Sequence, residues 1–285
     1  MDEKLLERLP RFTWADLKKK LDESAPFEAL SPMGTMLLRV KEFKPLIGLA
    51  VHAGSRIREE LQSKMGIEAE ERKYDEDTYS DYFIADFPVQ LIGLDSRYEY
   101  DVDRKREQAI YLKPFQCWGR KVWQTPPTKE EMEISYQKYD EAHELIDFFV
   151  NESIMKFGKA TVLDVHTYSH KRPLYGARTS TLPVFNVGTT KLDRKSHTKA
   201  IDQLLADLKG VQLNGAAVTV AENDVFKGDG AIISALAPKY PAALIVPLDI
   251  KKVFMDETSG KVDETIAQQI RASLAPIIGK LASNP

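Results

Sequence analysis

The clearest signal in the sequence is the run Thr161-Val162-Leu163-Asp164-Val165-His166-Thr167-Tyr168, which is followed by the polar, basic segment 169–173. Its β-branched and apolar residues predict a buried strand at the centre of a sheet. Such a strand would carry Asp164 and His166 to its carboxyl end. Open α/β sheets place their functional sites at that edge.

Two further apolar runs also end at side chains that can bind a metal or transfer a proton. Residues 45–51 are apolar and His52-Ala53-Gly54-Ser55 follows at once, while residues 242–248 are apolar and Asp249 comes next. Because the carboxyl ends of parallel strands meet at one edge of a sheet, we expect His52, His166 and Asp249 to converge there.

Helical patterns alternate with strand patterns along the chain. Strands are expected at 36–40, 45–51, near 91–94, 161–168, 182–188, 216–220 and 242–249, and helices at 57–65, 128–157, 196–208, 231–236 and 262–281. The alternation predicts an α/β fold in which helices cover both faces of a mixed, mostly parallel sheet. We expect residues 1–285 to form a single domain of three layers, α/β/α, with residues 1–35 as a peripheral, partly helical extension.

Composition excludes several classes of protein. The net charge is −3 and the pI is about 6.0, so no basic surface favours nucleic acid as a partner. The single cysteine excludes an intramolecular disulfide and a cysteine-rich zinc cluster. No apolar run reaches the roughly 20 residues that span a bilayer. We expect a soluble, cytoplasmic protein without a membrane partner, and the sequence leaves its oligomeric state open.

The histidines predict a metal site. A zinc hydrolase needs about three nitrogen or oxygen ligands and one open position for water. His52 and His166 at two strand ends, with a carboxylate from the acidic segment 76–81, would supply such a set. Alternatively, both histidines are ordinary loop residues and the acidic segment is a solvated turn. Their shared position directly after apolar runs gives the metal site equal weight for the histidines, whereas spacing alone favours the solvated turn for the acidic segment.

The segment 98–106 mixes acids with arginines. Arg104 and Arg106 are candidates to bind a substrate carboxylate, because a guanidinium matches the geometry of that group. They could equally pair with the acids beside them.

Five segments, in this order, resemble those of the N-formylglutamate amidohydrolases, a family of zinc-dependent amidases whose fold is similar to that of the zinc carboxypeptidases. They are His52-Ala53-Gly54-Ser55, Glu76-Asp77-Thr78-Tyr79-Ser80-Asp81, Ser96-Arg97-Tyr98-Glu99-Tyr100-Asp101-Val102-Asp103-Arg104, Asp164-Val165-His166-Thr167 and Ile250-Lys251-Lys252-Val253-Phe254-Met255-Asp256-Glu257. The resemblance spans roughly residues 45 to 260.

This resemblance implies a metal-dependent hydrolase that cleaves the amide of an N-formyl or N-acyl amino acid, such as N-formylglutamate. His52, Glu76 and His166 would bind Zn²⁺, and Asp77 is the alternative to Glu76. The other expected roles are catalysis by Asp249 and Arg104, substrate binding by Arg104, Ser55 and Arg56, and orientation of the ligands by Asp164 and Asp101.

The chain departs from the family pattern at two positions. Asp103 precedes Arg104 where the family has an asparagine, and the last core strand presents Asp249 where the family usually has a glutamate. The departures leave two alternatives open. One is a carboxypeptidase-like amide hydrolase with another substrate range, and the other is a hydrolase-like domain that has lost activity and serves as a binding module.

Overall fold

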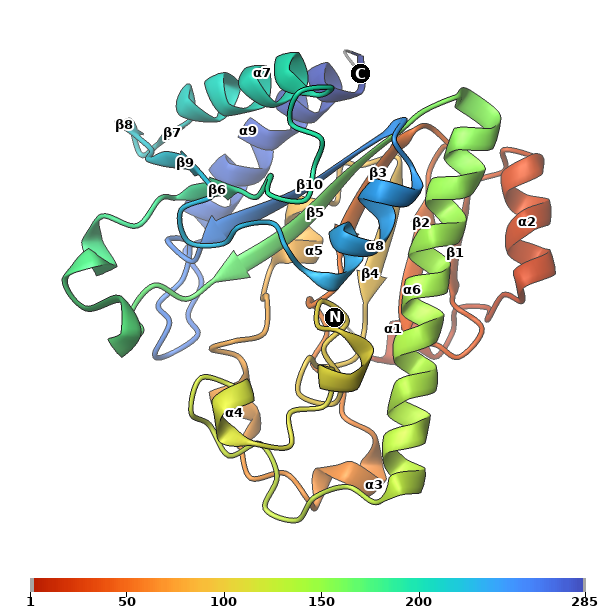
Figure 1. Cartoon of the computed structure of the whole chain (residues 1–285), viewed down its shortest axis with the longest axis vertical. Helices are drawn as coiled ribbons and strands as arrows, with labels where there is room; N and C mark the ends of the chain where they lie inside the picture. The colour runs from red at the N-terminus through yellow and green to blue at the C-terminus, as the bar shows by residue number, and fades with distance from the viewer. Residues whose placement is uncertain (1–2, 284–285) are drawn as a thin grey trace.

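A central sheet organises the chain, and the computed structural model describes residues 3–283 of it. Residues 1, 2, 284 and 285, which the predicted domain includes, lie outside the described residues. The strands of the sheet are β1 (Phe27–Leu30), β2 (Met36–Val40), β3 (Leu46–Ala50), β4 (Val89–Gly93), β5 (Ala160–Tyr168), β6 (Phe185–Val187), β9 (Val220–Glu222) and β10 (Ala243–Lys251). Within residues 3–283 they form an eight-stranded sheet in the order β1-β2-β4-β3-β5-β10-β6-β9 (Figure 1).

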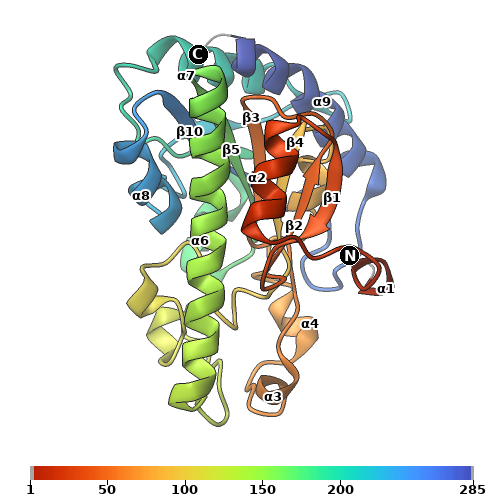
Figure 2. The ribbon, with the colours of Figure 1, turned by 90° about the vertical axis from the view of Figure 1, so that its right-hand side faces the viewer.

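Helices cover both faces of this sheet. They are α1 (Glu3–Leu6), α2 (Trp14–Asp22), α3 (Glu59–Gln62), α4 (Ala69–Arg72), α5 (Ser80–Phe83), α6 (Lys129–Phe157), α7 (Thr198–Lys209), α8 (Ala231–Lys239) and α9 (Glu264–Ser283), and a short hairpin pairs β7 (Gln212–Leu213) with β8 (Ala216–Ala217). One core cluster packs α2, α6 and α8 against the sheet, and another packs α5, α7 and α9 against it (Figures 1 and 2). In the part of the chain that is described, no helix is both long enough and apolar enough to cross a membrane.

The centre of the sheet is parallel. Strands β4, β3, β5 and β10 pair in parallel, whereas β1 with β2, β2 with β4, and β6 with β10 pair antiparallel. Both β5 and β10 are buried along their whole length, as their apolar runs predict. The mixed, mostly parallel α/β sheet is therefore confirmed, and its register places Asp249 directly beside His166.

The long helix α6 begins where the sequence predicts. The Thr128 side chain accepts a hydrogen bond from the Glu131 N–H (3.2 Å), and the Glu131 carboxylate accepts one from the Thr128 N–H (2.6 Å). This reciprocal cap satisfies two backbone donors that the first helical turn leaves free. The helix ends at Phe157 and is capped by Gly158, whose φ of 73° is left-handed.

The N-terminal segment is partly helical, with α1 and α2, but it also contributes a strand to the sheet, which the sequence did not indicate. Residues 27–30 form β1, which pairs antiparallel with β2 at the edge of the sheet. Leu17 and Leu21 of α2 are fully buried against the same sheet. The four-residue strand is too short to show a convincing alternation of apolar and polar residues, so the sequence did not reveal it.

Candidate metal and substrate site

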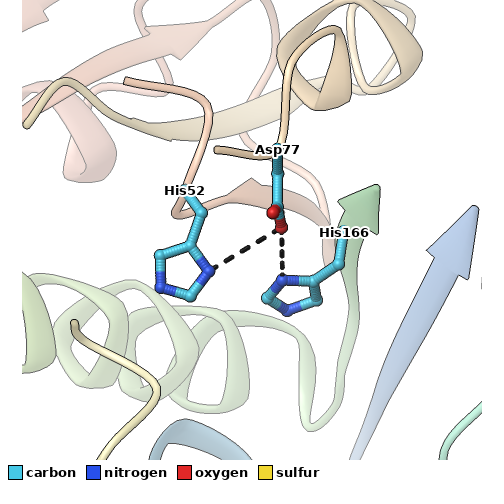
Figure 3. Close-up of side chains that lie close together, drawn as sticks. All are labelled: His52, Asp77 and His166. Carbon is cyan, nitrogen blue, oxygen red and sulfur yellow. Dashed lines mark hydrogen bonds and ion pairs between the residues drawn. The ribbon is translucent and has the colours of Figure 1, made fainter. Parts of the chain in front are cut away.

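The carboxyl ends of β3 and β5 bring two histidines and one aspartate together. His52 follows β3, His166 lies in β5, and Asp77 lies in the turn between α4 and α5. Asp77 Oδ2 is 2.9 Å from His166 Nδ1 and 3.7 Å from His52 Nδ1 (Figure 3). One donor atom from each of the three residues lies within 4.8 Å of the others, a spacing that could hold a metal ion. We call these residues the ligand cluster.

The Nε2 atom of each histidine ring, which points away from Asp77, contacts a carboxylate of its own. His52 Nε2 is 2.9 Å from Asp101 Oδ1, and His166 Nε2 is 3.1 Å from Asp164 Oδ2. These contacts fix the orientation of both rings, so that each Nδ1 faces Asp77. Metal-binding histidines are commonly held in this way by a carboxylate on the other ring nitrogen. Asp101 and Asp164 thus lie where the predicted orienting role requires.

The ligand cluster fits a divalent cation. His52 Nδ1 is buried and forms no hydrogen bond within the described residues. A buried polar atom without a partner costs free energy, which a bound cation would remove. Two imidazole nitrogens and one carboxylate oxygen are a donor set typical of zinc sites that leave a position open for water.

The charges around the histidines also favour a cation. Burial by itself lowers the pKa of His166, but the carboxylates of Asp164 and Asp77 outweigh it and raise that pKa well above its ordinary value. Burial by itself raises the pKa of Asp77, but the hydrogen bond with His166, the nearby His52 ring and the charge of Arg97 lower it far below the usual range. The Asp77 carboxylate therefore stays ionised, and positive charge beside it is stabilised.

Glu76, predicted as the carboxylate ligand, does not join the cluster. Its carboxylate accepts a hydrogen bond from Ser96 Oγ (2.6 Å) and lies 3.5 Å from Arg72 Nε. The alternative, Asp77, takes the place instead, and its N–H donates to the His52 carbonyl at 3.0 Å. This backbone bond ties the turn to the loop after β3 and turns the second of the two adjacent acids toward the histidines.

Asp249 lies in the same cleft, at the end of β10. Asn186 Nδ2 donates a hydrogen bond to Asp249 Oδ2 at 2.9 Å, and burial raises the pKa of Asp249 to about 7. Asn186 is itself fully buried and also accepts hydrogen bonds from the N–H groups of Asp224 and Val225. Sequence reasoning did not identify Asn186, because a lone asparagine in a short strand carries no motif.

Asp103, which replaces the family's asparagine, lies against the start of α8. Its carbonyl accepts a hydrogen bond from the Ala231 N–H at 3.0 Å, and burial raises the pKa of its carboxyl to about 6. A Cβ atom at Gly230 would lie 2.0 Å from the Asp103 carboxylate, so this approach requires a glycine. The start of a helix favours negative charge, which makes an acid acceptable there.

Arg97 contacts the cluster more closely than the sequence indicated. Its Nη2 donates to Asp101 Oδ2 at 2.9 Å, and its Nη1 lies 3.3 Å from Asp77 Oδ1. Arg104, to which we assigned the substrate, lines the same cleft but is exposed and forms no ion pair within residues 3–283. Arg106 instead pairs with Asp140 at 2.8 Å, outside the cleft.

Ser55 and Arg56, predicted to bind substrate, do not lie in this cleft. The Arg56 guanidinium pairs with Asp95 at 2.9 Å, and Ser55 is exposed. Both line a separate pocket that also contains Arg72. The loop turns away after Gly54, where a Cβ atom would lie only 2.1 Å from the Leu94 backbone, so adjacency to His52 in sequence does not place them beside the substrate.

The cleft has a volume of about 430 Å³ and contains the ligand cluster, Asp249 and Arg104. Trp118 also lines the cleft, from an irregular segment of the chain. The Arg172 guanidinium lies 4.3 Å from the Trp118 ring centroid, and the Arg97 guanidinium lies 5.4 Å from it. These contacts fix Trp118 beside the cluster.

Comparison with known proteins gives the family of the chain. The profile of the N-formylglutamate amidohydrolase family matches residues 44–250. The chain belongs to this family. It is therefore a hydrolase of C–N amide bonds with a small-molecule substrate, as the resemblance implied.

Solved structures share the fold of this amidohydrolase. The N-formylglutamate amidohydrolase from Ralstonia eutropha JMP134 is 17% identical with a TM-score of 0.70, and the match covers 87% of this chain and 97% of that one. A protein from Agrobacterium tumefaciens is 18% identical with a TM-score of 0.62, covering 87% of this chain and 95% of that one. A search of curated proteins finds no match.

Proposed function

We propose that this amidohydrolase depends on zinc and hydrolyses N-formyl or other N-acyl amino acids. The observation that carries the proposal is the ligand cluster of His52, Asp77 and His166, in which Asp101 and Asp164 hold the far ring nitrogens. Asp249 lines the same cleft. A cleft that combines metal ligands, a buried acid and an available arginine has the parts that amide hydrolysis requires.

Each of these groups has a separate role in the proposed reaction. Zinc, when bound, would polarise the substrate carbonyl and lower the pKa of water. Asp249 accepts a proton from the attacking water and returns it to the leaving nitrogen. Arg97, beside Asp77 and Asp101, is placed to stabilise the negative charge that develops on the carbonyl oxygen. Arg104 binds the carboxylate of the amino acid.

The test combines metal content with hydrolysis. Protein purified without added zinc is expected to hold about one equivalent of the metal and to release the acyl group from N-formyl amino acids. His166→Ala removes a ligand beyond the apolar part of β5, so it should lose the metal while the protein stays folded. His197→Ala is the matched control, since His197 lies at the start of α7. Unchanged zinc content in His166→Ala contradicts the proposed site. A folded parent that binds no metal under any loading would favour a binding module.

A further inference from the structure

A second cavity of about 310 Å³ adjoins the cleft. The side chains that line it are Arg104, Gln108, Tyr111, Phe115, Gln116 and Trp118. Arg104, Gln108 and Trp118 line both cavities, so the two meet at these side chains. We call the second cavity the annex.

Three aromatic rings of different exposure line the annex. Tyr111 is buried, and its hydroxyl donates to Asp101, which also holds His52. Trp118 is 39% exposed and Phe115 is 79% exposed. Large apolar side chains that are grouped and left exposed beside a cavity are typical of ligand-binding surfaces. The annex is therefore connected to the ligand cluster at its buried end, through Tyr111 and Asp101, and is exposed at its other end, at Phe115.

The backbone at Trp118 is held in an unfavourable conformation. Its φ of 48° is left-handed, which is uncommon for a bulky residue. Such a conformation persists where surrounding contacts enforce it, and these sites are often ligand clamps. Here the enforcing contacts include the guanidinium groups of Arg172 and Arg97 over the Trp118 ring. The ring is thus presented at the junction of the two cavities.

We propose that the annex receives an aromatic side chain of the substrate's amino acid, which makes the preferred substrates N-acyl aromatic amino acids. This inference rests on the proposed function. Arg104 stands at the junction and binds the α-carboxylate, so the side chain on the neighbouring carbon enters the annex while the amide remains at the cluster. Among the described residues that line the annex, Arg104 is the one cation. With Arg104 bound to the α-carboxylate, the lining presents two exposed rings, Phe115 and Trp118, against which an aromatic side chain packs. Lys113 lies outside the lining, over the Phe115 ring at 5.9 Å.

The experiment compares kcat/KM for the N-formyl derivatives of phenylalanine, alanine and glutamate. The parent is expected to prefer phenylalanine over alanine by roughly 10- to 100-fold, the range that an apolar pocket provides. Phe115→Ala and Trp118→Ala should reduce this ratio by about tenfold. Met155→Ala is the matched control, because Met155 is 76% exposed on α6 and lines neither cavity, and it should leave the ratio unchanged.

Two results would overturn the proposal. One is a parent that prefers the glutamate derivative, and the other is a phenylalanine-to-alanine ratio that neither annex variant changes. Because Phe115 is exposed, Phe115→Ala is expected to fold even if Trp118→Ala does not. If the parent hydrolyses no N-formyl amino acid, the proposed function fails, and calorimetric binding of N-formylphenylalanine tests the annex alone. Binding that weakens in Phe115→Ala then supports the annex, and equal or absent binding refutes it.

Discussion

The ligand cluster and the annex differ in how much of their chemistry the protein itself satisfies. In the cluster, His52 and His166 are buried. His166 contacts a carboxylate at both ring nitrogens, and His52 is held by a carboxylate at Nε2. At the annex, Arg104 forms no ion pair within residues 3–283 and Phe115 is largely exposed. Reacting groups must be held in place before the substrate arrives, whereas groups that recognise the substrate must remain available to it. Substitutions in the cluster should therefore affect metal binding and turnover, and substitutions around the annex should affect the choice of substrate.

The largest effect is expected from Asp249→Asn. The change keeps the size of the side chain and removes the base, so turnover should fall on the order of 10²–10⁴ while zinc is retained. Steady-state kinetics with parallel metal analysis measures both quantities. Asp202→Asn is the control, because the Asp202 side chain is 60% exposed and pairs with Arg194 outside the cleft. Full activity in Asp249→Asn would mean that another acidic residue acts as the general base. If the reach of the carboxylate limits the enzyme, Asp249→Glu should be at least as fast as the parent.

Next in size is the difference between Asp77→Asn and Glu76→Gln. Removing the charge of a direct metal ligand should weaken zinc binding by more than about 100-fold, since even outer contacts of metal sites contribute 10- to 100-fold. Glu76 contacts Ser96 and Arg72 instead, so Glu76→Gln should bind zinc much like the parent. Competition with a chromogenic chelator gives both affinities. The opposite order would restore Glu76 as the ligand.

A smaller effect is expected from Asp164→Asn. Its carboxylate lies 3.1 Å from His166 Nε2 and orients the ring without facing Asp77. Loss of such a contact typically costs 10- to 100-fold in metal affinity, so the variant should fall between the parent and Asp77→Asn. The same chelator assay ranks the three proteins. An affinity equal to that of the parent would show that β5 alone orients His166.

The sequence predicted that His52, His166 and Asp249 converge, and in the structure all three line one cleft. The apolar runs before His52, His166 and Asp249 indicated parallel strands, and side chains at the carboxyl ends of such strands must share one edge. The choice between Glu76 and Asp77 could not be made from sequence. It depends on how one turn is held, here by a backbone bond from Asp77 to His52 that has no sequence signature.

Predictions for substrate binding were weaker because loops form that part of the cleft. Ser55 and Arg56 follow His52 in the chain, but the close approach of Gly54 to Leu94 directs them into a separate pocket. Phe115 and Trp118 belong to an irregular segment, and its position depends on contacts such as the Arg120–Asp75 ion pair (3.1 Å). Such contacts join residues that are distant in sequence, so local periodicity does not reveal them.

The smallest effect is expected from Arg104→Lys, and it addresses the exposed side of the comparison. An ammonium keeps the charge but cannot form the two parallel hydrogen bonds that a guanidinium offers to a carboxylate. Loss of one such bond should lower kcat/KM by about tenfold for an N-formyl amino acid with a free α-carboxylate. The same substrate with its carboxylate converted to an amide should be affected much less. Arg106→Lys is the matched control, because Arg106 already pairs with Asp140. Equal losses on both substrates would mean that Arg104 supports the structure of the cleft. Recognition of the carboxylate would then pass to another cation that lines the cleft, such as Lys105 or Arg172.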